Sequence, residues 1–236
     1  MKASFFLGNK TFELRENELS EPGFQEVTIR VAACGVCGTD VHIFYGEKGS
    51  AEVIPPVVLG HEFAGIVEQV GLGVTSLKVG DHVTVDPNIY CGECRFCHSG
   101  KKQMCERLSA VGVTRDGGFA EYCRVPAKQC LILNPNISLE TGAMAEPIAC
   151  CIHGVDRVGI RSGDAVLVIG GGAIGLIMVQ LARLAGASHV VLSEPVEMRR
   201  TVGMSLGATA TVDPRTEDLN VVLKREFGAD GADIVI

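Results

Sequence analysis

The stretch AVLVIGGGAIG, residues 165–175, decides how the second half of this chain folds. Its first five residues are continuously apolar and rich in β-branched side chains, which is typical of a strand buried on both faces of a parallel sheet. The glycines that follow have the spacing GxGxxG: Gly170 permits a tight turn, Gly172 lets a pyrophosphate approach the backbone, and Gly175 lets the next helix pack closely on the strand. Because that helix directs its N-terminus at the phosphates, Gly170, Gly172, Ile174 and Gly175 are candidate contacts of a dinucleotide cofactor.

A second apolar run, HVVLS, leads to Glu194, about twenty residues beyond the glycine turn. A carboxylate at this position can accept hydrogen bonds from the adenosine ribose hydroxyls, and it would repel a 2′-phosphate, which favours NAD over NADP. Arg199 and Arg200 favour the opposite choice, because a nearby arginine can hold that phosphate; the alternatives are that these arginines cover the adenine or are solvated. Glu194 and Arg199 are both candidate cofactor contacts, and NAD is the coenzyme that we expect.

Helices and strands alternate to the end of the chain, as in a doubly wound parallel sheet. After HVVLS come a helix, the short strand ATVD, the helix LNVVLKREFG and the strand ADIVI. The chain stops at Ile236, within a segment that reads as a buried strand. We therefore expect a longer protein, of which this chain lacks the second half of the dinucleotide domain.

The composition limits the classes of protein that the chain can belong to. Its 236 residues are 47% hydrophobic and 21% charged, which is typical of a globular protein with one large or two ordinary domains. A formal net charge of −7 argues against a nucleic-acid-binding surface. No signal peptide is visible at residues 1–10, and no apolar run is long enough for a membrane helix. Ten cysteines in such a chain indicate metal ligands or free thiols in a reducing cytoplasm, so we expect a cytoplasmic protein without nucleic-acid or membrane partners.

The first half of the chain reads as a compact β-rich domain, because short alternating runs are cut repeatedly by glycine and proline. Within it stand Gly60, His61 and Glu62, with Cys37 on an earlier loop. A thiolate, an imidazole and a carboxylate together suit zinc, and three protein ligands leave the fourth tetrahedral position open for water or substrate. Cys37, His61 and Glu62 are therefore candidate ligands of a catalytic zinc.

Three residues shortly after Cys37 can support chemistry at such a metal. Thr39 offers a hydroxyl that can pass on a proton, and His42 can take that proton toward solvent because imidazoles titrate near neutral pH. Asp40 can orient His61 from outside the metal shell. For Thr39 and Asp40 the alternative is the capping of a turn after two glycines.

Cys91, Cys94, Cys97 and Cys105 have the spacing of a zinc site with four thiolate ligands. Two tight CxxC steps present the sulfurs at tetrahedral angles, and because four protein ligands close the shell, this zinc would be structural. An iron–sulfur cluster and an isolated zinc ribbon that binds nucleic acid are the competing interpretations. Ferredoxin-type runs end in a cysteine followed by proline, whereas Glu106 follows Cys105, and the acidic balance argues against the ribbon.

Glu146 lies in an otherwise apolar neighbourhood within residues 139–158, which read as largely helical despite Pro147. Ser138 is the expected N-cap of this segment. A carboxylate among apolar residues is expected to be paired or bound to a metal, because an unpaired buried charge is costly. The residues alone leave open whether Glu62 or Glu146 is the third ligand of the catalytic zinc.

Taken together, these motifs resemble the zinc-dependent medium-chain alcohol dehydrogenases. The resemblance is carried by GHEFAGIVEQVGLGV (60–74), CGVCGTDVH (34–42), the four-cysteine lobe and VLVIGGGAIG (166–175), and it extends over essentially all 236 residues. It implies an α/β plus β fold: a chaperonin-10-like (GroES-like) β-barrel catalytic domain over 1–149, with the structural zinc lobe at 88–108, and then the first half of a Rossmann NAD-binding domain, a doubly wound parallel sheet, over 150–236.

One departure from the liver-type alcohol dehydrogenases points to a particular branch of the family. Where those enzymes place a second cysteine ligand, this chain has Glu146 in the sequence AEP, which is similar to the sorbitol and threonine dehydrogenases. In that branch the metal is held by the equivalents of Cys37, His61 and Glu62, and the equivalent of Glu146 lies close by, either bound directly or through water. Both glutamates therefore remain candidate ligands.

The resemblance also implies a function. A zinc-dependent oxidoreductase would transfer a hydride from a polyol or secondary alcohol to NAD+, giving the ketone, with one catalytic and one structural zinc per subunit. Thr39, the nicotinamide ribose and His42 would carry away the hydroxyl proton, and Glu146 is counted with them as catalytic. The alternatives are an L-threonine 3-dehydrogenase, a zinc-free quinone reductase or non-catalytic relative, and a zinc-ribbon binding protein that would bind zinc but no NAD. Family members are often tetramers, so a homo-oligomer, tetramer or dimer, is expected.

Overall fold

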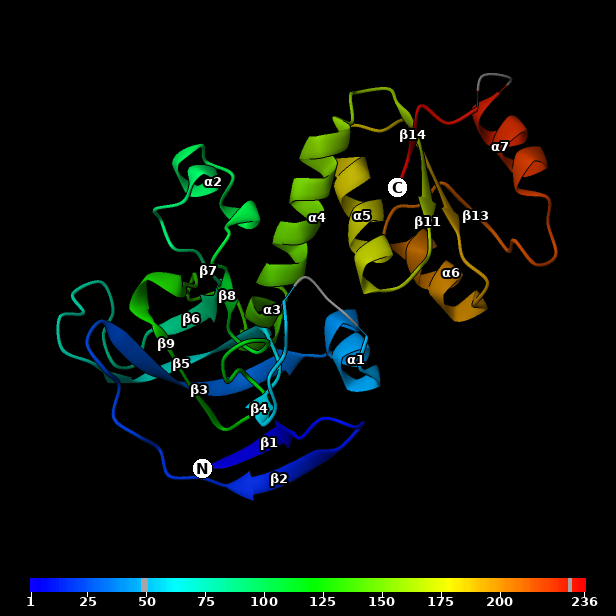
Figure 1. The fold of residues 1–236 in the computed structure, drawn as a ribbon. Coiled ribbons are helices and arrows are strands. Elements are labelled where there is room, and N and C mark those ends of the chain that lie inside the picture. The colour runs from blue at the N-terminus through cyan, green and yellow to red at the C-terminus, as the bar shows by residue number, and fades with distance from the viewer. Residues whose placement is uncertain (48–50, 229–230) are drawn as a thin grey trace. The chain divides into compact units, whose positions relative to one another are not determined.

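The computed structural model describes residues 1–47, 51–228 and 231–236, and the chain divides into two compact units, Met1–Glu146 and Pro147–Ile236. The limits expected from the sequence, 1–149 and 150–236, remain a prediction. Figure 1 shows strands dominating the first unit, and helices alternating with strands in the second. Across the described ranges, no helix has the length and apolar character needed to cross a membrane.

The first unit is built from antiparallel strands, as its short alternating runs predict. They form a five-stranded sheet in the order β10-β6-β5-β3-β9, a three-stranded sheet in the order β2-β1-β4, and the pair β7-β8. The strands are β1 (Lys2–Phe6), β2 (Phe12–Glu16), β3 (Glu26–Gly35), β4 (Val57–Val58), β5 (Glu62–Val70), β6 (His82–Val85), β7 (Asn88–Ile89), β8 (Ser109–Ala110), β9 (Tyr122–Pro126) and β10 (Cys130–Ile132). The helices are α1 (Gly38–Tyr45), α2 (Arg95–His98) and α3 (Leu139–Ala143), with 3-10 turns at Lys102–Met104 and Ala127–Gln129.

The pairing of β3 with β5 determines where the candidate zinc ligands lie. These strands run antiparallel, from Val27 opposite Val70 to Gly35 opposite Glu62. The loop that leaves β3 toward Cys37 and the start of β5 are therefore neighbours at one end of the sheet. Both strands are fixed by the largest apolar core of this unit, in which Ile29 of β3 and Phe63 of β5 are fully buried.

Helix α1 follows β3 almost directly, at the position where the capping of a turn was the alternative interpretation of Thr39 and Asp40. Cys37 is its N-cap residue, and the Cys37 backbone N–H donates to Asp40 Oδ2 at 2.9 Å. The helix ends at Gly46, which has a left-handed φ of 76°. Asp40 therefore has a capping role, but it caps the N-terminus of a helix and not a turn.

The segment 139–158 is helical, as expected, but it consists of two helices. Ser138 caps α3 by accepting the Thr141 N–H, which confirms its predicted role. Helix α3 ends with Met144 as its C-cap, which keeps right-handed helical backbone angles, and α4 (Ala145–Val158) begins at the next residue. The break places Pro147 in the first turn of α4, where a missing N–H costs no intrahelical hydrogen bond.

The second unit contains a parallel sheet in the order β13-β12-β11-β14, which confirms the predicted alternation of helices and strands. Its elements beyond α4 are β11 (Ala165–Ile169), α5 (Ala173–Leu184), β12 (His189–Ser193), α6 (Glu197–Ser205), β13 (Ala210–Val212), α7 (Leu219–Phe227) and β14 (Ile234–Val235). The AVLVI run forms β11, and its first four residues are buried because the strand is covered on both faces.

Candidate active site

The structure brings the proposed catalytic zinc ligands together. One donor atom each from Cys37, His61 and Glu62 lies within 4.8 Å of the other two, at the end of the β3–β5 pairing where Gly35 stands opposite Glu62. Gly35 makes this arrangement possible, because a Cβ atom at residue 35 would overlap the Glu62 carboxylate. A sulfur, an imidazole nitrogen and a carboxylate oxygen gathered in this way fit a zinc ion, whose bonds to such atoms are about 2.0–2.3 Å long.

Asp40 lies behind His61. Its Oδ1 atom is 3.7 Å from His61 Nδ1, both residues are buried, and neither atom has a hydrogen-bond partner among the described residues. Burial alone would lower the pKa of His61, but the nearby Cys37, Asp40 and Glu146 outweigh it and raise that pKa. Burial also raises the pKa of Asp40, and the Cys37 N–H opposes this shift only in part. The pair is placed for Asp40 to orient the imidazole, as the sequence suggested.

Glu62 and Glu146, the two candidates for the third zinc ligand, both lie near the His61 imidazole. Glu62 belongs to the group whose donor atoms lie within 4.8 Å, whereas Glu146, in the first turn of α4, acts on His61 through its charge. The structure thus places the Glu62 carboxylate among the candidate ligand atoms and the Glu146 charge beside His61, and the choice of third ligand between Glu62 and Glu146 remains a prediction. A role for Glu146 through a water molecule is compatible with this arrangement.

Thr39 and His42 lie three residues apart on α1, so their side chains share one face of the helix. Both are exposed to solvent. His42 Nδ1 lies 2.5 Å from Glu47 Oε2, and this contact was not predicted from the sequence. When Nδ1 carries the proton, the carboxylate accepts it in a hydrogen bond and Nε2 is left as the acceptor.

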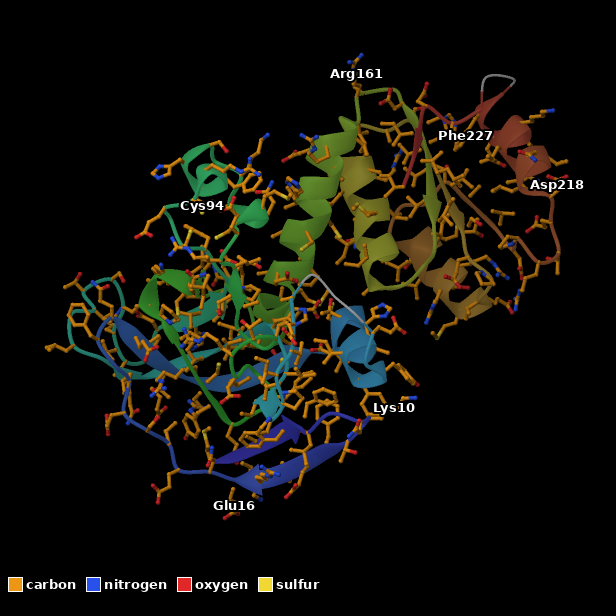
Figure 2. All side chains as sticks on the ribbon, in the orientation of Figure 1. Lys10, Glu16, Cys94, Arg161, Asp218 and Phe227 are labelled. Carbon is orange, nitrogen blue, oxygen red and sulfur yellow. The ribbon has the colours of Figure 1, made fainter. Side chains whose placement is uncertain are left out.

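The four-cysteine lobe around α2 forms a second compact group of sulfurs, and Figure 2 labels Cys94 within it. Sγ of Cys94 and Sγ of Cys97 are 3.6 Å apart, and all four sulfurs lie within 4.8 Å of one another. The N–H groups of Glu93 and Cys94 lower the pKa of Cys91 to about 6. Thiolates are the species that bind zinc, so four thiols held this closely fit a closed structural zinc site.

An ion pair missed by sequence reasoning borders this lobe. Arg107 Nη2 lies 2.6 Å from Glu93 Oε2, and the hydrogen bond to Glu93, followed by that to Cys91, raises the pKa of the guanidinium. The Arg107 backbone N–H also donates to Cys105 Sγ at 3.4 Å. Positive charge and N–H donors at the sulfurs offset the negative charge of a four-thiolate site. The CxxC spacing predicts the ligands, but it carries no information about these partners.

The glycine turn between β11 and α5 has the local geometry that its motif requires. Gly170 has a φ of 100°, which favours glycine, and a side chain at Gly172 would point into open space. A Cβ atom on Gly175 would overlap the Gly170 carbonyl, so glycine is required there for the helix to approach the turn. Ile174 lies in the first turn of α5 and is half exposed. The N-cap residue of α5 is Gly172, which has no side chain to cap the helix, so the first N–H groups of the helix are available to a ligand. The turn therefore fits a pyrophosphate.

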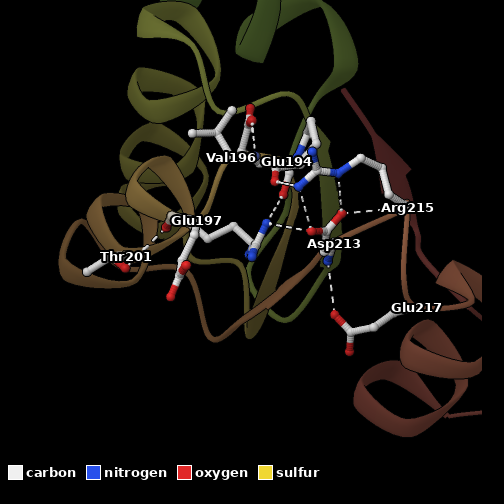
Figure 3. Close-up of polar contacts among 9 residues, drawn as sticks. Glu194, Val196, Glu197, Thr201, Asp213, Arg215 and Glu217 are labelled. Atoms are coloured by element: carbon white, nitrogen blue, oxygen red, sulfur yellow. Dashed lines mark hydrogen bonds and ion pairs between the residues drawn. The ribbon is translucent and has the colours of Figure 1, made fainter.

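Glu194 and Arg199 follow β12 on the same edge of the sheet, but Glu194 is not an open side chain. The Gly171 N–H donates to Glu194 Oε2 at 2.6 Å, and the Val196 N–H donates to Oε1 at 2.7 Å (Figure 3). Burial alone would raise the pKa of Glu194, but these donors and the neighbouring arginines outweigh it and lower that pKa. Arg199 is half exposed, with Nη1 3.9 Å from Glu194 Oε2.

Two family descriptions match the chain. Residues 23–135 match the alcohol dehydrogenase GroES-like domain, and residues 173–236 match the zinc-binding dehydrogenase domain. The L-threonine 3-dehydrogenase of Caldanaerobacter subterraneus subsp. tengcongensis is 40% identical over 95% of this chain and 65% of that enzyme. The 2-dehydro-3-deoxy-L-galactonate 5-dehydrogenase of Pseudoalteromonas atlantica is 35% identical over 100% of this chain and 68% of that enzyme.

Solved structures show the same similarity. A zinc-binding dehydrogenase from Sinorhizobium meliloti 1021, solved with bound NADP, has a TM-score of 0.93 and 43% identity, over 99% of this chain and 68% of the other. The 2R,3R-butanediol dehydrogenase of Bacillus subtilis has a TM-score of 0.90 and 31% identity, over 99% of this chain and 69% of the other. The chain thus spans about two thirds of the length of the proteins that it matches.

Proposed function

The chain belongs to the zinc-dependent medium-chain alcohol dehydrogenase family, and on that premise we propose that it acts as an NAD(P)-dependent oxidoreductase on CH–OH donors. The proposed reaction removes a hydride from a polyol or secondary alcohol and gives the ketone. The fold expected from the sequence, a GroES-like domain followed by a Rossmann-like domain, is confirmed by the matching family descriptions and by the solved relatives.

The observation that carries the proposal is the convergence of Cys37, His61 and Glu62. A zinc ion held there would act as a Lewis acid, polarising the alcohol oxygen and favouring the loss of its proton. Asp40 would hold the imidazole in its orientation from behind. The Glu146 carboxylate would add a negative charge near His61. Three protein ligands leave the exchangeable position that such chemistry requires.

Thr39 and His42 are the proposed carriers of the alcohol proton. They share one face of α1, whose N-cap is the proposed ligand Cys37, so the helix links the ligand to both side chains. The Thr39 hydroxyl can both accept and donate a proton, and His42 is open to bulk solvent. The contact of His42 Nδ1 with Glu47 favours the tautomer in which Nε2 can accept that proton.

The glycine turn is the proposed site of the coenzyme pyrophosphate, and the bound coenzyme would supply the nicotinamide that accepts the hydride. Gly170, Gly172, Ile174 and Gly175 would form this turn. The sequence favours NAD over NADP through Glu194, and that preference remains a prediction. The second proposed metal is a structural zinc on the four cysteines of the lobe, supported by the close approach of their sulfurs.

A threonine 3-dehydrogenase is the second candidate. The relative that is 40% identical over 95% of this chain has that activity by name, and the AEP sequence at Glu146 fits the same branch. Threonine carries a secondary alcohol beside an amino acid carboxylate, so the same metal chemistry applies to it. The proposed protein is cytoplasmic and acts on a small molecule. It forms a homo-oligomer, either a tetramer or a dimer, and it has no nucleic-acid or membrane partners.

The test combines a metal count with coenzyme reduction. Full-length protein should bind two zinc ions per subunit, and it should reduce NAD or NADP with at least one member of a panel of polyols, secondary alcohols and L-threonine. Cys37→Ser should abolish this activity with the loss of one zinc. Cys150→Ser, an exposed cysteine outside both clusters, is the matched control and should retain both zinc ions. Zinc binding without any binding of NAD or NADP would support the zinc-ribbon alternative instead.

A further inference from the structure

The backbone that carries His61 lies between two strands. β4 ends at Val58 and β5 begins at Glu62, so residues 59–61 belong to neither strand. The pairing of β3 with β5 ends with Gly35 opposite Glu62. The sheet therefore fixes the backbone of Glu62 directly, whereas the position of the His61 imidazole depends on contacts made by the connecting residues.

These contacts come from a glycine-rich loop, residues 112–119, which lies outside both metal-binding motifs and outside the dinucleotide turn. Three consecutive N–H groups of this loop donate to the three consecutive carbonyls that precede His61: Gly117 to Val58 at 2.8 Å, Phe119 to Leu59 at 2.9 Å and Gly118 to Gly60 at 2.7 Å. Because the three acceptor residues are buried, water does not replace these donors, and a lost contact leaves an unsatisfied carbonyl.

The 112–119 loop approaches the backbone before His61 so closely that two of its positions have no room for a side chain. A Cβ atom on Gly117 would overlap the Gly60 carbonyl oxygen. A Cβ atom on Gly112 would overlap the same carbonyl and would lie 2.9 Å from the His61 backbone nitrogen. Protein interiors are close-packed, so a larger residue at either position has to displace the loop or the peptide that leads into His61.

The loop is anchored by elements other than the proposed metal ligands. The Phe119 ring packs in the apolar cluster around Leu59, and the Phe119 carbonyl accepts the Ser4 N–H of β1 at 2.9 Å. Arg115 Nη2 lies 3.2 Å from Oε1 of Glu26, the first residue of β3. Because the loop is held by β1 and β3, it provides a fixed support for the backbone of residues 58–60.

The His61 imidazole needs such support because metal bonds tolerate little displacement. Ligand distances in zinc sites stay within about 0.2 Å of their ideal values, so a backbone shift of about 1 Å takes a ring nitrogen out of bonding range. Asp40 Oδ1, which is 3.7 Å from His61 Nδ1, can orient the ring but cannot restore a displaced backbone.

We propose that the 112–119 loop positions His61 for metal binding, and that Gly117 is a positioning residue of the catalytic zinc site. The inference rests on the proposed function in requiring that zinc binds at Cys37, His61 and Glu62. It extends that site to residues that have no ligand atom of their own and act only through the backbone that precedes His61. Gly117 is the residue to change, because its side chain position meets the Gly60 carbonyl and its backbone angles also suit alanine.

The test is a competition for zinc with a chelator, on the full-length, zinc-loaded protein, in which the two zinc ions are removed in separate steps. Cys37→Ser identifies the step that belongs to the catalytic site, because this variant lacks only that zinc. Gly117→Ala should lower the zinc affinity of the catalytic site about 10- to 100-fold, the usual loss when a ligand is no longer held in place. The four-cysteine site should keep its affinity within about two-fold and serves as the internal reference.

Gly65→Ala is the matched control for the effect of a steric clash alone. A Cβ atom on Gly65 would overlap the Arg30 carbonyl, so this substitution also forces a side chain against a backbone carbonyl. Gly65 lies within β5, opposite Val31 of β3, and not beside residues 59–61. Both variants should have a lower Tm than wild type, but only Gly117→Ala should lose zinc affinity at the catalytic site. Equal weakening in both variants would reflect general instability and would overturn the inference.

Asp116→Ala perturbs the same support without a clash. The Asp116 side chain is exposed and accepts the Val58 N–H at 2.9 Å, so the variant should fold even if Gly117→Ala does not. It should weaken zinc binding at the catalytic site about five-fold, the effect of one lost hydrogen bond.

Two results separate this inference from the proposed function. The inference is overturned, and the proposed function left intact, if Gly117→Ala keeps the catalytic zinc affinity within about two-fold of wild type. The same result in Asp116→Ala overturns it if Gly117→Ala does not fold. Wild-type protein that binds zinc only at the four cysteines would refute both the inference and the proposed function.

Discussion

Replacing Asp40 should weaken the catalytic metal site without changing a ligand. One Asp40 oxygen accepts the Cys37 N–H at 2.9 Å, and the other lies 3.7 Å from His61 Nδ1. Asp40→Ala removes both contacts, which frees the loop that carries the thiolate and leaves the buried imidazole with no acceptor to orient it. Asp40→Asn keeps an acceptor for the Cys37 N–H but removes the charge that faces His61.

The two contacts have different expected magnitudes. Loss of a residue that orients a metal-bound histidine typically costs about 10- to 100-fold in metal affinity. Loss of the capping hydrogen bond costs about 1 kcal/mol of unfolding free energy, which corresponds to a Tm decrease of about 4 °C for a unit of this size. We therefore expect Asp40→Ala to bind zinc about 10- to 100-fold more weakly than wild type and to have a lower Tm. Asp40→Asn should bind zinc about ten-fold more weakly, with little change in Tm.

The assay is a competition for zinc with a chromophoric chelator, paired with thermal denaturation. Asp81→Ala is the matched control, because Asp81 accepts the Lys78 N–H at 2.9 Å with the same three-residue spacing, on the turn before β6. It should lower Tm and leave zinc affinity unchanged. If Asp40→Ala lowers Tm but retains zinc affinity within about two-fold of wild type, Asp40 only caps α1 and the orienting role is wrong.

Three other predictions concern the metal lobe, the proton path and acid stability. Cys94→Ser should lower Tm more than it lowers activity per folded molecule, because a structural zinc contributes to folding. Zinc content, Tm and activity are measured together, and an equally large loss of Tm and of activity per folded molecule would contradict a purely structural role. His42→Ala should slow alcohol oxidation mainly at low pH, and an unchanged pH–rate profile would remove His42 from the proton path. Because the folded-state pKa of Asp213 is lowered, its contribution to stability is present above the ordinary carboxyl pKa and is lost as pH falls. Asp213→Asn should therefore show a flatter fall in Tm below about pH 5 than wild type, and parallel curves would refute this.

Features that depend on local spacing could be predicted from the sequence. The glycine turn, the four-cysteine lobe and the alternation of helices with strands after Asp164 each depend on residues close together in the chain, and the structure contains them where expected. Ser138 as a helix N-cap belongs to the same class. The clustering of Cys37 with His61 depends on the register of β3 against β5, and only the chemistry of the residue types suggested it.

Features that depend on tertiary context could not be predicted in this way. Helix α1 has only eight residues and contains Gly38 and the β-branched Thr39, Val41 and Ile43, so its intrinsic helix propensity is weak. The helix forms because Asp40 caps its N-terminus and because Ile43 is buried. Glu194 was expected to face the ribose, but it is buried against a glycine 23 positions earlier. No pattern within the segment 189–199 signals that contact, because it depends on how the turn after β11 lies beside β12.

The most direct test of the account is to locate the metal. Anomalous diffraction at the zinc edge from crystals of the zinc-loaded, full-length protein should show one zinc bound by Cys37, His61 and Glu62, and a second bound by Cys91, Cys94, Cys97 and Cys105. The same data on Cys37→Ser should lose the first peak and retain the second. A single zinc peak at the four cysteines in wild-type protein, with His61 and Cys37 free of metal at saturating zinc, would contradict the central claim that this is a catalytic zinc site.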